Sequence, residues 1–232
     1  MKVLLLHTCG AEGSAALADS LREEPVVAMA TMPGRTASER LVAVIRELVE
    51  EAGWRLAELG AVVVVSGPGS FTGVRVGLSA AKGLSDALGT PVVAVSRLAL
   101  LAGAARPVEG EVCAVLDAGR GEYYCGQYRR NGEGAAECVA ETLVGFEDAL
   151  ALARRAGAGA VIACEAKVAE AFAAVSPRVM LDLVGEPTAA DALPIAWERI
   201  EQELFDDPVT LDANYLRRTD AEIFAKKAGN RE

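Results

Sequence analysis

The sequence predicts a two-lobe α/β protein made of two successive units with the same element order, βββαβαβα. Its 232 residues suffice for two small lobes, and a composition of 52% hydrophobic and 24% charged residues is typical of a globular chain. Short apolar runs alternate with segments of helical periodicity in the same order in both halves. We expect lobes at 1–106 and 107–232, and leave open that the last helix packs back on the first lobe.

The first unit is assigned from apolar runs for strands and from 3.6-residue periodicity for helices. Thr36 and Glu39 have the spacing of a capping box for its first helix, which Gly53 ends, while Gly89 and Pro91 stop its second helix. In order, we expect strands at 2–8, 14–18 and 25–31, a helix at 39–52, a strand at 61–66, a helix at 73–88, a strand at 92–95 and a short helix to 105.

The second unit follows a linker at 106–110 and repeats this order. Asn131-Gly132 is a hairpin turn signal between its second and third strands. In order, we expect strands at 112–118, 122–128 and 137–143, a helix at 147–156, a strand at 160–164, a helix to 175, a strand at 178–183 and a helix at 189–205.

The charge distribution argues against direct binding to nucleic acid. The net charge is −10, the first 106 residues are electroneutral, and all the excess negative charge lies in the second half. Neither half has the basic surplus that binds phosphate backbones, and only 5% of the residues are aromatic, which leaves little for base stacking. We therefore expect no DNA partner, and contact with RNA only through another chain.

The cysteines and the apolar runs indicate a cytoplasmic protein. There are five cysteines, an odd number, and no C-x-x-C pair, which favours reduced buried thiols over disulfides or a zinc site. The N-terminal apolar run is too short for a signal peptide, and no run is long enough to cross a membrane.

A glycine-rich loop joins a strand to a helix in the first unit, within the segment SGPGSFTGVR. Such a loop presents amide donors that can bind an anion, although it matches neither the Walker nor the dinucleotide template. A tight structural turn and an anion site both remain open. The candidate anion-binding residues are Gly67, Gly69, Ser70, Thr72, Gly73 and Arg75.

The helix after this loop is apolar or small over most of its circumference. Gly73, Gly77 and Gly83 lie inside it, and each interior glycine costs about 0.5–1 kcal/mol relative to alanine. A close approach of another backbone is one reason for them. One side should face its own sheet. The other side meets the helix at 39–52, a second protein, or both.

The sequence favours no catalytic or metal site. The single histidine, His7, excludes a two-histidine metal site within one chain, and at a strand end it is more typical of a packed core residue. Asp117 and Glu122 flank Gly119-Arg120-Gly121. They form either a polar cleft site or a turn held by hydrogen bonds between side chains and backbone, and the second interpretation is favoured.

Three motifs together resemble the bacterial TsaB (YeaZ) family. The first is SGPGSFTGVRVGLSAAKGL followed by PVVAVSRLALLA, and the second is DAGRGEYYCGQY. The second is similar to the family's D-A-R-x-G-E-V-Y segment at Asp117, Ala118, Gly121, Glu122 and Tyr124. The third is Tyr215-Leu216-Arg217. The resemblance implies the two-lobe actin-like ATPase (ribonuclease H-like) fold that acetate and sugar kinases, heat-shock ATPases and actin share.

The resemblance also implies a function. Members are non-catalytic partners of TsaD, the related subunit that carries ATP and metal. With TsaE and an enzyme that makes threonylcarbamoyl-adenylate, they install threonylcarbamoyl on the adenosine next to the anticodon of tRNA. This chain would then be a pseudo-enzyme subunit with no cofactor of its own, contacting tRNA indirectly. The alternative is an ATP-dependent phosphotransferase or ATPase that uses the SGPGSFTGVR loop.

On this interpretation, the helices at 39–52 and 73–88 pair with the equivalent helices of TsaD, or of a second copy when TsaD is absent. The residues predicted to form the interface are Val42, Val49, Val76, Ala80 and Gly83, with Leu41, Ile45 and Leu48 facing the sheet. Two positions depart from the family pattern: His7 stands where relatives have an aspartate, and Ala37-Ser38 where relatives often have a histidine. An imidazole cannot replace a carboxylate that organises Mg²⁺, which argues against kinase-like chemistry.

Overall fold

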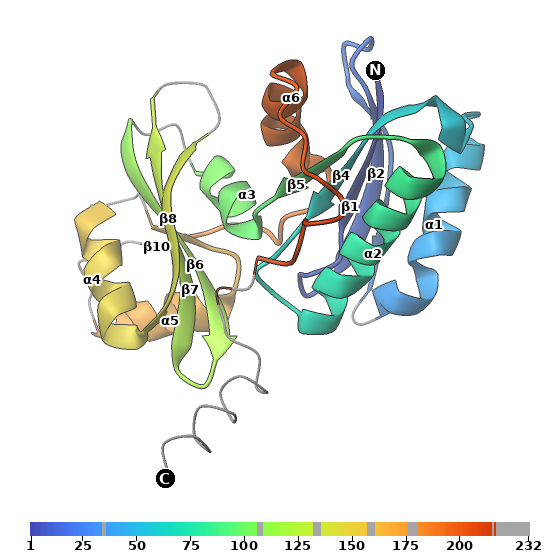
Figure 1. The fold of residues 1–232 in the computed structure, drawn as a ribbon. Helices are drawn as coiled ribbons and strands as arrows, with labels where there is room; N and C mark the ends of the chain where they lie inside the picture. The colour runs from blue at the N-terminus through green and yellow to red at the C-terminus, as the bar shows by residue number, and fades with distance from the viewer. Residues whose placement is uncertain are drawn as a thin grey trace, which may run out of the picture.

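The computed structural model describes residues 1–33, 36–105, 109–131, 136–156, 161–175, 181–214 and 216. Two five-stranded sheets form two lobes, with strand orders β3-β2-β1-β4-β5 and β10-β9-β6-β7-β8 (Figure 1). Read from its other edge, the second sheet has the order β8-β7-β6-β9-β10. This is the order of the first sheet with five added to each strand number. The predicted duplication of βββαβαβα units is confirmed.

The first sheet consists of strands rich in valine, leucine and alanine, and its centre is fully buried. Strand β1 runs antiparallel to β2 and parallel to β4, which is in turn parallel to β5. Both faces of the central strands are covered, as their continuous apolar sequences require. The strands are β1 (Lys2–His7), β2 (Gly13–Asp19), β3 (Val26–Met32), β4 (Leu59–Val65) and β5 (Val92–Val95).

Helices α1 (Ala37–Glu51) and α2 (Phe71–Leu88) lie side by side on the outer face of this sheet (Figure 1). The predicted stripe Leu41, Ile45 and Leu48 is buried against the sheet. Gly89 ends α2 in the left-handed region with φ +65°, where glycine is favoured. The first sheet's core therefore lies between its strands and these two helices.

The predicted capping box at the start of α1 is wrong. The hydroxyl of Thr36 donates to the carbonyl of Pro33, 2.9 Å away, and its side chain caps no amide of the helix. Thr36 has φ −82° and ψ −4°, a helical conformation instead of the extended one that a capping residue adopts, so the sequence spacing alone did not determine the geometry.

The second sheet repeats the arrangement with its own helices, α4 (Phe146–Ala156) and α5 (Ala166–Val175), on the outer face. Phe172 of α5 is fully buried and meets Tyr123 and Phe146 edge-on, with ring centroids 5.7 and 5.4 Å away. The strands are β6 (Gly110–Gly119), β7 (Glu122–Arg130), β8 (Glu137–Gly145), β9 (Val161–Ala163) and β10 (Leu181–Leu183). Residues 106–108, Gly132, Ala160 and 178–180, which the sequence assigned to linker, turn and strands, lie outside the described residues.

The last helix of each unit packs on the sheet of the other lobe. Helix α3 (Arg97–Gly103) packs through Leu98 and Leu101 on β6 and β7 of the second sheet. Helix α6 (Leu193–Glu201) packs through Leu193 and Ala196 in the core of the first lobe, beside β5. Both lie between the two sheets in Figure 1. Each unit therefore contributes its last helix to the packing of the other lobe.

The predicted helix at 189–205 is shorter than expected. A 3₁₀ turn at Ala190–Ala192 precedes α6, which ends at Glu201. Glu203 then takes a left-handed conformation with φ +55°, and the backbone N–H of Asp206 donates to Val92 of β5 at 2.9 Å. Pairing with the free edge of β5 is the reason the chain leaves the helix early.

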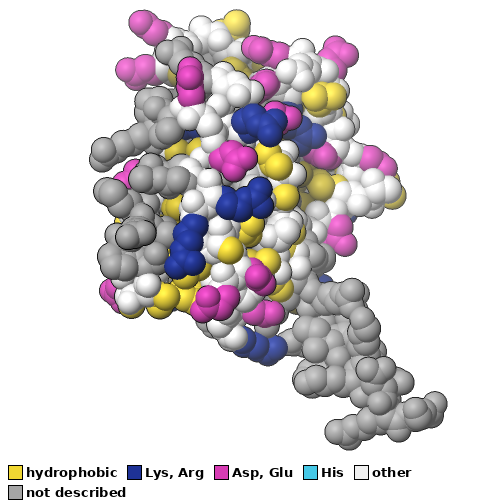
Figure 2. All heavy atoms as spheres, turned by 90° about the vertical axis from the view of Figure 1, so that its left-hand side faces the viewer, with side chains coloured by type: hydrophobic (Ala, Val, Ile, Leu, Met, Phe, Trp, Pro, Cys, Tyr) yellow, Lys and Arg dark blue, Asp and Glu magenta, His cyan; other side chains and the backbone are white. Residues whose placement is uncertain are grey.

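No described helix is long and apolar enough to span a membrane. The face of the second lobe seen in Figure 2 carries interspersed acidic and basic side chains with small apolar areas between them. Such mixed charge is typical of a solvated surface.

Candidate functional site

The glycine loop between β4 and α2 packs tightly against the end of β1. A Cβ on Gly69 would lie 2.1 Å from the carbonyl oxygen of Cys9, and one on Gly73 would lie 1.9 Å from that of Thr8. The Thr8 hydroxyl also donates to the Gly73 carbonyl at 2.6 Å. These two glycines are therefore required by close approach of the β1 backbone, as the sequence suggested for the helix interior.

Several amides of this loop already have partners within the chain. The N–H of Ser70 donates to Cys9 at 2.8 Å, that of Gly73 to the Ser70 hydroxyl at 3.2 Å, and that of Val74 to the Ser70 carbonyl. An anion at this helix start would have to compete with these bonds. The contacts support the structural-turn interpretation of the loop, and anion binding stays a prediction.

The other predicted loop residues differ in exposure. The Arg75 guanidinium stacks over the Phe71 ring at 3.8 Å from its centroid, and both side chains are exposed, as is Thr72. Gly67 has φ +105°, a conformation that favours glycine, and its carbonyl accepts from the N–H of Arg97. Of the six residues, Ser70, Thr72 and Gly73 line one hollow of about 510 Å³ next to Thr8 and Gly10.

A groove of about 600 Å³ runs between α1 and α2 on the outside of the first lobe. Val42 on its rim is 77% exposed, and Phe71 is 49% exposed. Val76 and Ala80 are half-buried in its floor. Its lining is mostly apolar or small, and Arg75 is its one charged member among the described residues. The lining residues are Ser38, Leu41, Val42, Phe71, Thr72, Arg75, Val76, Ser79 and Ala80.

The remaining predicted interface residues fall in two different environments. Gly83 is exposed, and a Cβ there would meet nothing within 4 Å, so nothing within the described chain requires this glycine. Val49 is only 6% exposed, because it follows Ile45 by four residues on the stripe that faces the sheet. It therefore offers little surface to a partner.

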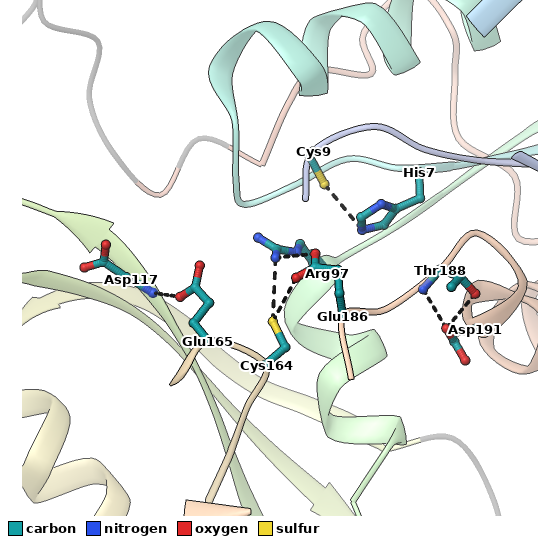
Figure 3. A network of polar contacts seen from close by, with 9 residues as sticks. All are labelled: His7, Cys9, Arg97, Asp117, Cys164, Glu165, Glu186, Thr188 and Asp191. Atoms are coloured by element: carbon teal, nitrogen blue, oxygen red, sulfur yellow. Dashed lines mark hydrogen bonds and ion pairs between the residues drawn. The ribbon is translucent and has the colours of Figure 1, made fainter. Parts of the chain in front are cut away.

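A second region of interest, called the crevice below, is the buried boundary between the lobes, where residues at the carboxyl ends of strands from both sheets are in contact. In open α/β sheets ligands bind outside these strand ends. Here the crevice holds His7 and Cys9 from the end of β1, Arg97 from the start of α3, and Cys164 and Glu186 from the second lobe (Figure 3).

Arg97 and Glu186 form an ion pair across this crevice. The guanidinium Nη2 donates to Glu186 Oε1 at 2.6 Å, and the Arg97 side chain is 5% exposed. The Cys164 thiol donates to Glu186 Oε2 at 3.3 Å. Burial, with the nearby carboxylate opposing ionisation, raises the pKa of the Cys164 thiol to about 12, so it stays protonated as a donor.

His7 and Cys9 are uncharged in the crevice. Burial, reinforced by the Arg97 charge, lowers the pKa of His7 to about 3, and the imidazole is neutral at neutral pH. Burial raises the pKa of the Cys9 thiol to about 11, against the attraction of Arg97. The Cys9 thiol is therefore not in the thiolate form that nucleophilic or metal chemistry needs.

Asp117 and Glu122 flank a turn in which Gly119, Arg120 and Gly121 all have positive φ. The Asp117 carboxylate pairs with Lys167 at 2.5 Å, and its backbone N–H donates to Glu165 at 2.6 Å. Figure 3 shows Asp117 and Glu165 at the edge of the crevice. The segment is therefore a glycine turn with Asp117 beside the crevice, and the hydrogen bonds from its side chains to its backbone stay a prediction.

Sequence reasoning missed the ion pair of Arg97 with Glu186. The two residues are far apart in sequence, and Glu186 lies in a connection without periodicity. The sequence contains one signal, which is that Arg97 begins a short helix whose next five residues are all apolar. All five cysteines are free thiols, and the described residues contain no group of His, Cys, Asp and Glu placed to hold a metal.

Comparison with known sequences gives a consistent set of relatives. Residues 31–231 match the family model described as TsaD: tRNA N6-adenosine threonylcarbamoyltransferase. A Bacillus subtilis protein named tRNA threonylcarbamoyladenosine biosynthesis protein TsaB is 38% identical over 48% of this chain and 50% of its own. The Escherichia coli protein of the same name is 34% identical over 43% and 44%. The chain spans about half the length of the curated relatives it matches.

Solved structures extend the similarity over nearly the whole chain. A Pseudomonas aeruginosa protein described as similar to peptidase YeaZ has a TM-score of 0.75 and 28% identity, covering 93% of this chain and 99% of its own. YeaZ from the same organism has a TM-score of 0.74 and 26% identity, with 92% and 99% covered. Tyr215 and Arg217 of the third motif lie outside the described residues.

Proposed function

The chain belongs to the TsaB (YeaZ) family within the wider TsaD family, and on that premise we propose that it is a non-catalytic subunit that binds a TsaD-type partner. The assembly would act in the biosynthesis of tRNA threonylcarbamoyladenosine, the process named for its relatives. ATP and metal would be bound by the partner, and TsaE and tRNA would join through the complex. The proposed location is the cytoplasm.

The observation that carries this proposal is the exposed apolar groove between α1 and α2. A valine at 77% exposure beside an aromatic ring at 49% is costly to leave in water, and both line one hollow. The groove floor of small residues allows the close approach of another helix pair. We therefore assign to the partner the groove residues Val42, Phe71, Val76 and Ala80, together with the exposed Gly83 further along α2.

Gly83 adds an independent argument for the same surface. The close approach of β1 explains Gly73 and Gly77, but nothing in the described chain explains Gly83. An exposed interior glycine costs helix stability, so a function outside the isolated chain is the physical reason left for it. The electroneutral first half also suits a desolvated interface, because unpaired buried charge is costly.

The filled crevice supports the non-catalytic part of the proposal. The space outside the strand ends, where a ligand would sit, contains the ion pair of Arg97 with Glu186 and the neutral His7. The loop amides are bonded to Cys9 and Ser70. The phosphotransferase alternative predicts binding and turnover of Mg-ATP by the chain alone, which calorimetry and a phosphate-release assay would detect.

The test of partner binding is co-purification with the cognate TsaD-type protein. Gly83→Phe is expected to reduce the complex at least tenfold, since the ring would block helix approach, while Gly83 is exposed and a Cβ there meets nothing within 4 Å in the described chain. Gly103→Phe is the matched control. A Cβ on Gly103 would also meet nothing within 4 Å, but this residue lies on α3, away from the proposed interface. Without the partner, the same surface is expected to form a homodimer that Gly83→Phe dissociates.

Two results would count against the proposal. Equal co-purification of the wild-type and Gly83→Phe chains would remove the α2 face from the interface. Equal loss with Gly103→Phe would place the effect in folding or in a different surface. Thermal unfolding of both variants, expected close to wild type, separates folding from binding.

A further inference from the structure

The crevice between the lobes has the features of an oxyanion site whose occupant is part of the chain. Strand ends of both sheets border it, and a buried guanidinium lies inside it. The Glu186 carboxylate reaches it from the connection between β10 and the 3₁₀ turn at Ala190–Ala192. Figure 3 shows this carboxylate between Arg97 and Cys164.

Donors from both lobes surround the carboxylate. Arg97 of the first lobe donates to Oε1 at 2.6 Å, and Cys164 of the second lobe donates to Oε2 at 3.3 Å. The turn after β1 is shaped around the same oxygen, because a Cβ on Gly10 would lie 2.1 Å from Oε1 and 2.7 Å from the His7 ring. Any side chain at position 10 would occupy the space of the anion.

The site also has hydrogen-bonding capacity that Glu186 does not use. The Arg97 Nε and the His7 Nδ1 are buried and have no hydrogen-bond partner among the described residues. Arg97 is 4% exposed and His7 fully buried, so water does not readily satisfy them. A carboxylate has two oxygens, whereas a phosphate ion has four and can accept from more of these donors.

We propose that Glu186 is an internal substitute for an oxyanion ligand, and that Arg97 with the Gly10 turn binds inorganic phosphate once this carboxylate is removed. In the wild-type chain the carboxylate neutralises the buried guanidinium and excludes phosphate from the crevice. Removing it leaves a desolvated cation that a mobile oxyanion can neutralise. The inference concerns the crevice alone and is independent of the partner surface.

The test uses the full chain and thermal unfolding with inorganic phosphate, at constant ionic strength set with chloride. Glu186→Ala is expected to unfold at a lower temperature than wild type. Phosphate at about ten times its dissociation constant should raise the midpoint of this variant by about 3–6 °C. The midpoint of wild type should not change, because its crevice is occupied.

Acetate and a second variant make the assignment specific. Acetate should raise the midpoint of Glu186→Ala less than phosphate at the same concentration, since its two oxygens cannot accept from as many of these donors as the four of phosphate can. The double variant R97M/E186A should respond to neither anion, because it lacks the guanidinium. A response in the double variant, a response to acetate alone, or an equal phosphate response in wild type would each overturn the proposal.

If Glu186→Ala does not fold, Glu186→Gln carries the test. The amide keeps the volume of the carboxylate and removes its charge. The proposal expects a midpoint below wild type that phosphate does not change, because the crevice is still filled. A midpoint equal to that of wild type would mean that Arg97 needs no anion and would overturn the proposal.

Discussion

His7 illustrates how the burial of a single residue makes the stability of the folded chain depend on pH. The imidazole ends β1 in the crevice, fully buried, near the Cys9 thiol and the Arg97 guanidinium. Its pKa is lowered to about 3 from 6.5, mainly by burial. The unfolded chain therefore binds a proton between these values that the folded chain does not, and stability falls as pH decreases through this window.

We expect the free energy of unfolding to fall by about 2 kcal/mol between pH 7 and about pH 5 through His7. The comparison is with His7→Gln, which is neutral throughout and keeps a polar side chain of similar length. Denaturant titrations of both proteins across this range measure the difference, since other groups contribute equally to both. Parallel curves for the two proteins would show that His7 is not buried in its neutral form.

At the residue scale, the sequence predicts burial better than it predicts partners. The burial of His7 and of the stripe through Leu41 follows from apolar patterns within one element. The pairing of Arg97 with Glu186 depends on two loops brought together by the fold, and no local pattern records it. The sequence predicts that Val49 faces a partner. In the structure it is buried, because the stripe that faces the sheet is wide enough to include it.

Helix α2 contains two kinds of interior glycine, and they should respond oppositely to the same substitution. A Cβ on Gly77 would lie 2.5 Å from the hydroxyl of Thr8, which is itself bonded to the Gly73 carbonyl. A Cβ on Gly83 would contact nothing within 4 Å. One glycine is required by packing within the chain, and the other is not.

We expect Gly77→Ala to destabilise the isolated chain by about 1–3 kcal/mol, because the β1 end must shift to admit the methyl group. Gly83→Ala should stabilise it by about 0.5–1 kcal/mol, because alanine restricts the unfolded chain. Urea unfolding of the two variants and wild type measures both effects. The same sign for both substitutions would contradict this account of the helix.

At the element scale, the existence and order of the elements could be predicted and their ends less well. The strands and helices occur where periodicity places them, because those patterns reflect burial against a sheet. The capping box failed since Thr36 turns toward Pro33. The last helix ends at Glu201 because Asp206 forms a backbone hydrogen bond with Val92 at the edge of β5. The sequence of the helix does not indicate a contact with a strand so far away in the chain.

At the scale of the whole molecule, the two lobes are joined by the exchange of α3 and α6, each of which packs in the hydrophobic core of the other lobe. Ala192, Leu193 and Ala196 complete the core of the first lobe, although they belong to the second unit. Leu98 and Leu101 do the same for the second lobe. The duplicated element order predicts the sheets but not this exchange, because periodicity shows that a helix face is apolar without showing which sheet it meets.

We expect the fragment 1–106 to show no cooperative thermal transition, because the inner face of its sheet would be exposed without α6. Mixing it with the fragment 107–232 should restore a transition, since each supplies the helix that the other lacks. Calorimetry of the fragments, their mixture and the full chain measures this. Cooperative melting of 1–106 alone would mean that α6 is dispensable for the first lobe.

The exchange of helices also has a consequence for synthesis on the ribosome. Domains generally fold as soon as they emerge, N-terminal first, at about 5–20 residues per second. The leading sheet of this chain cannot be completed until α6, near residue 200, has left the exit tunnel. Its valine-rich strands therefore wait about 5–20 s after translation of their own segment, an interval in which a nascent-chain chaperone would have to shield them.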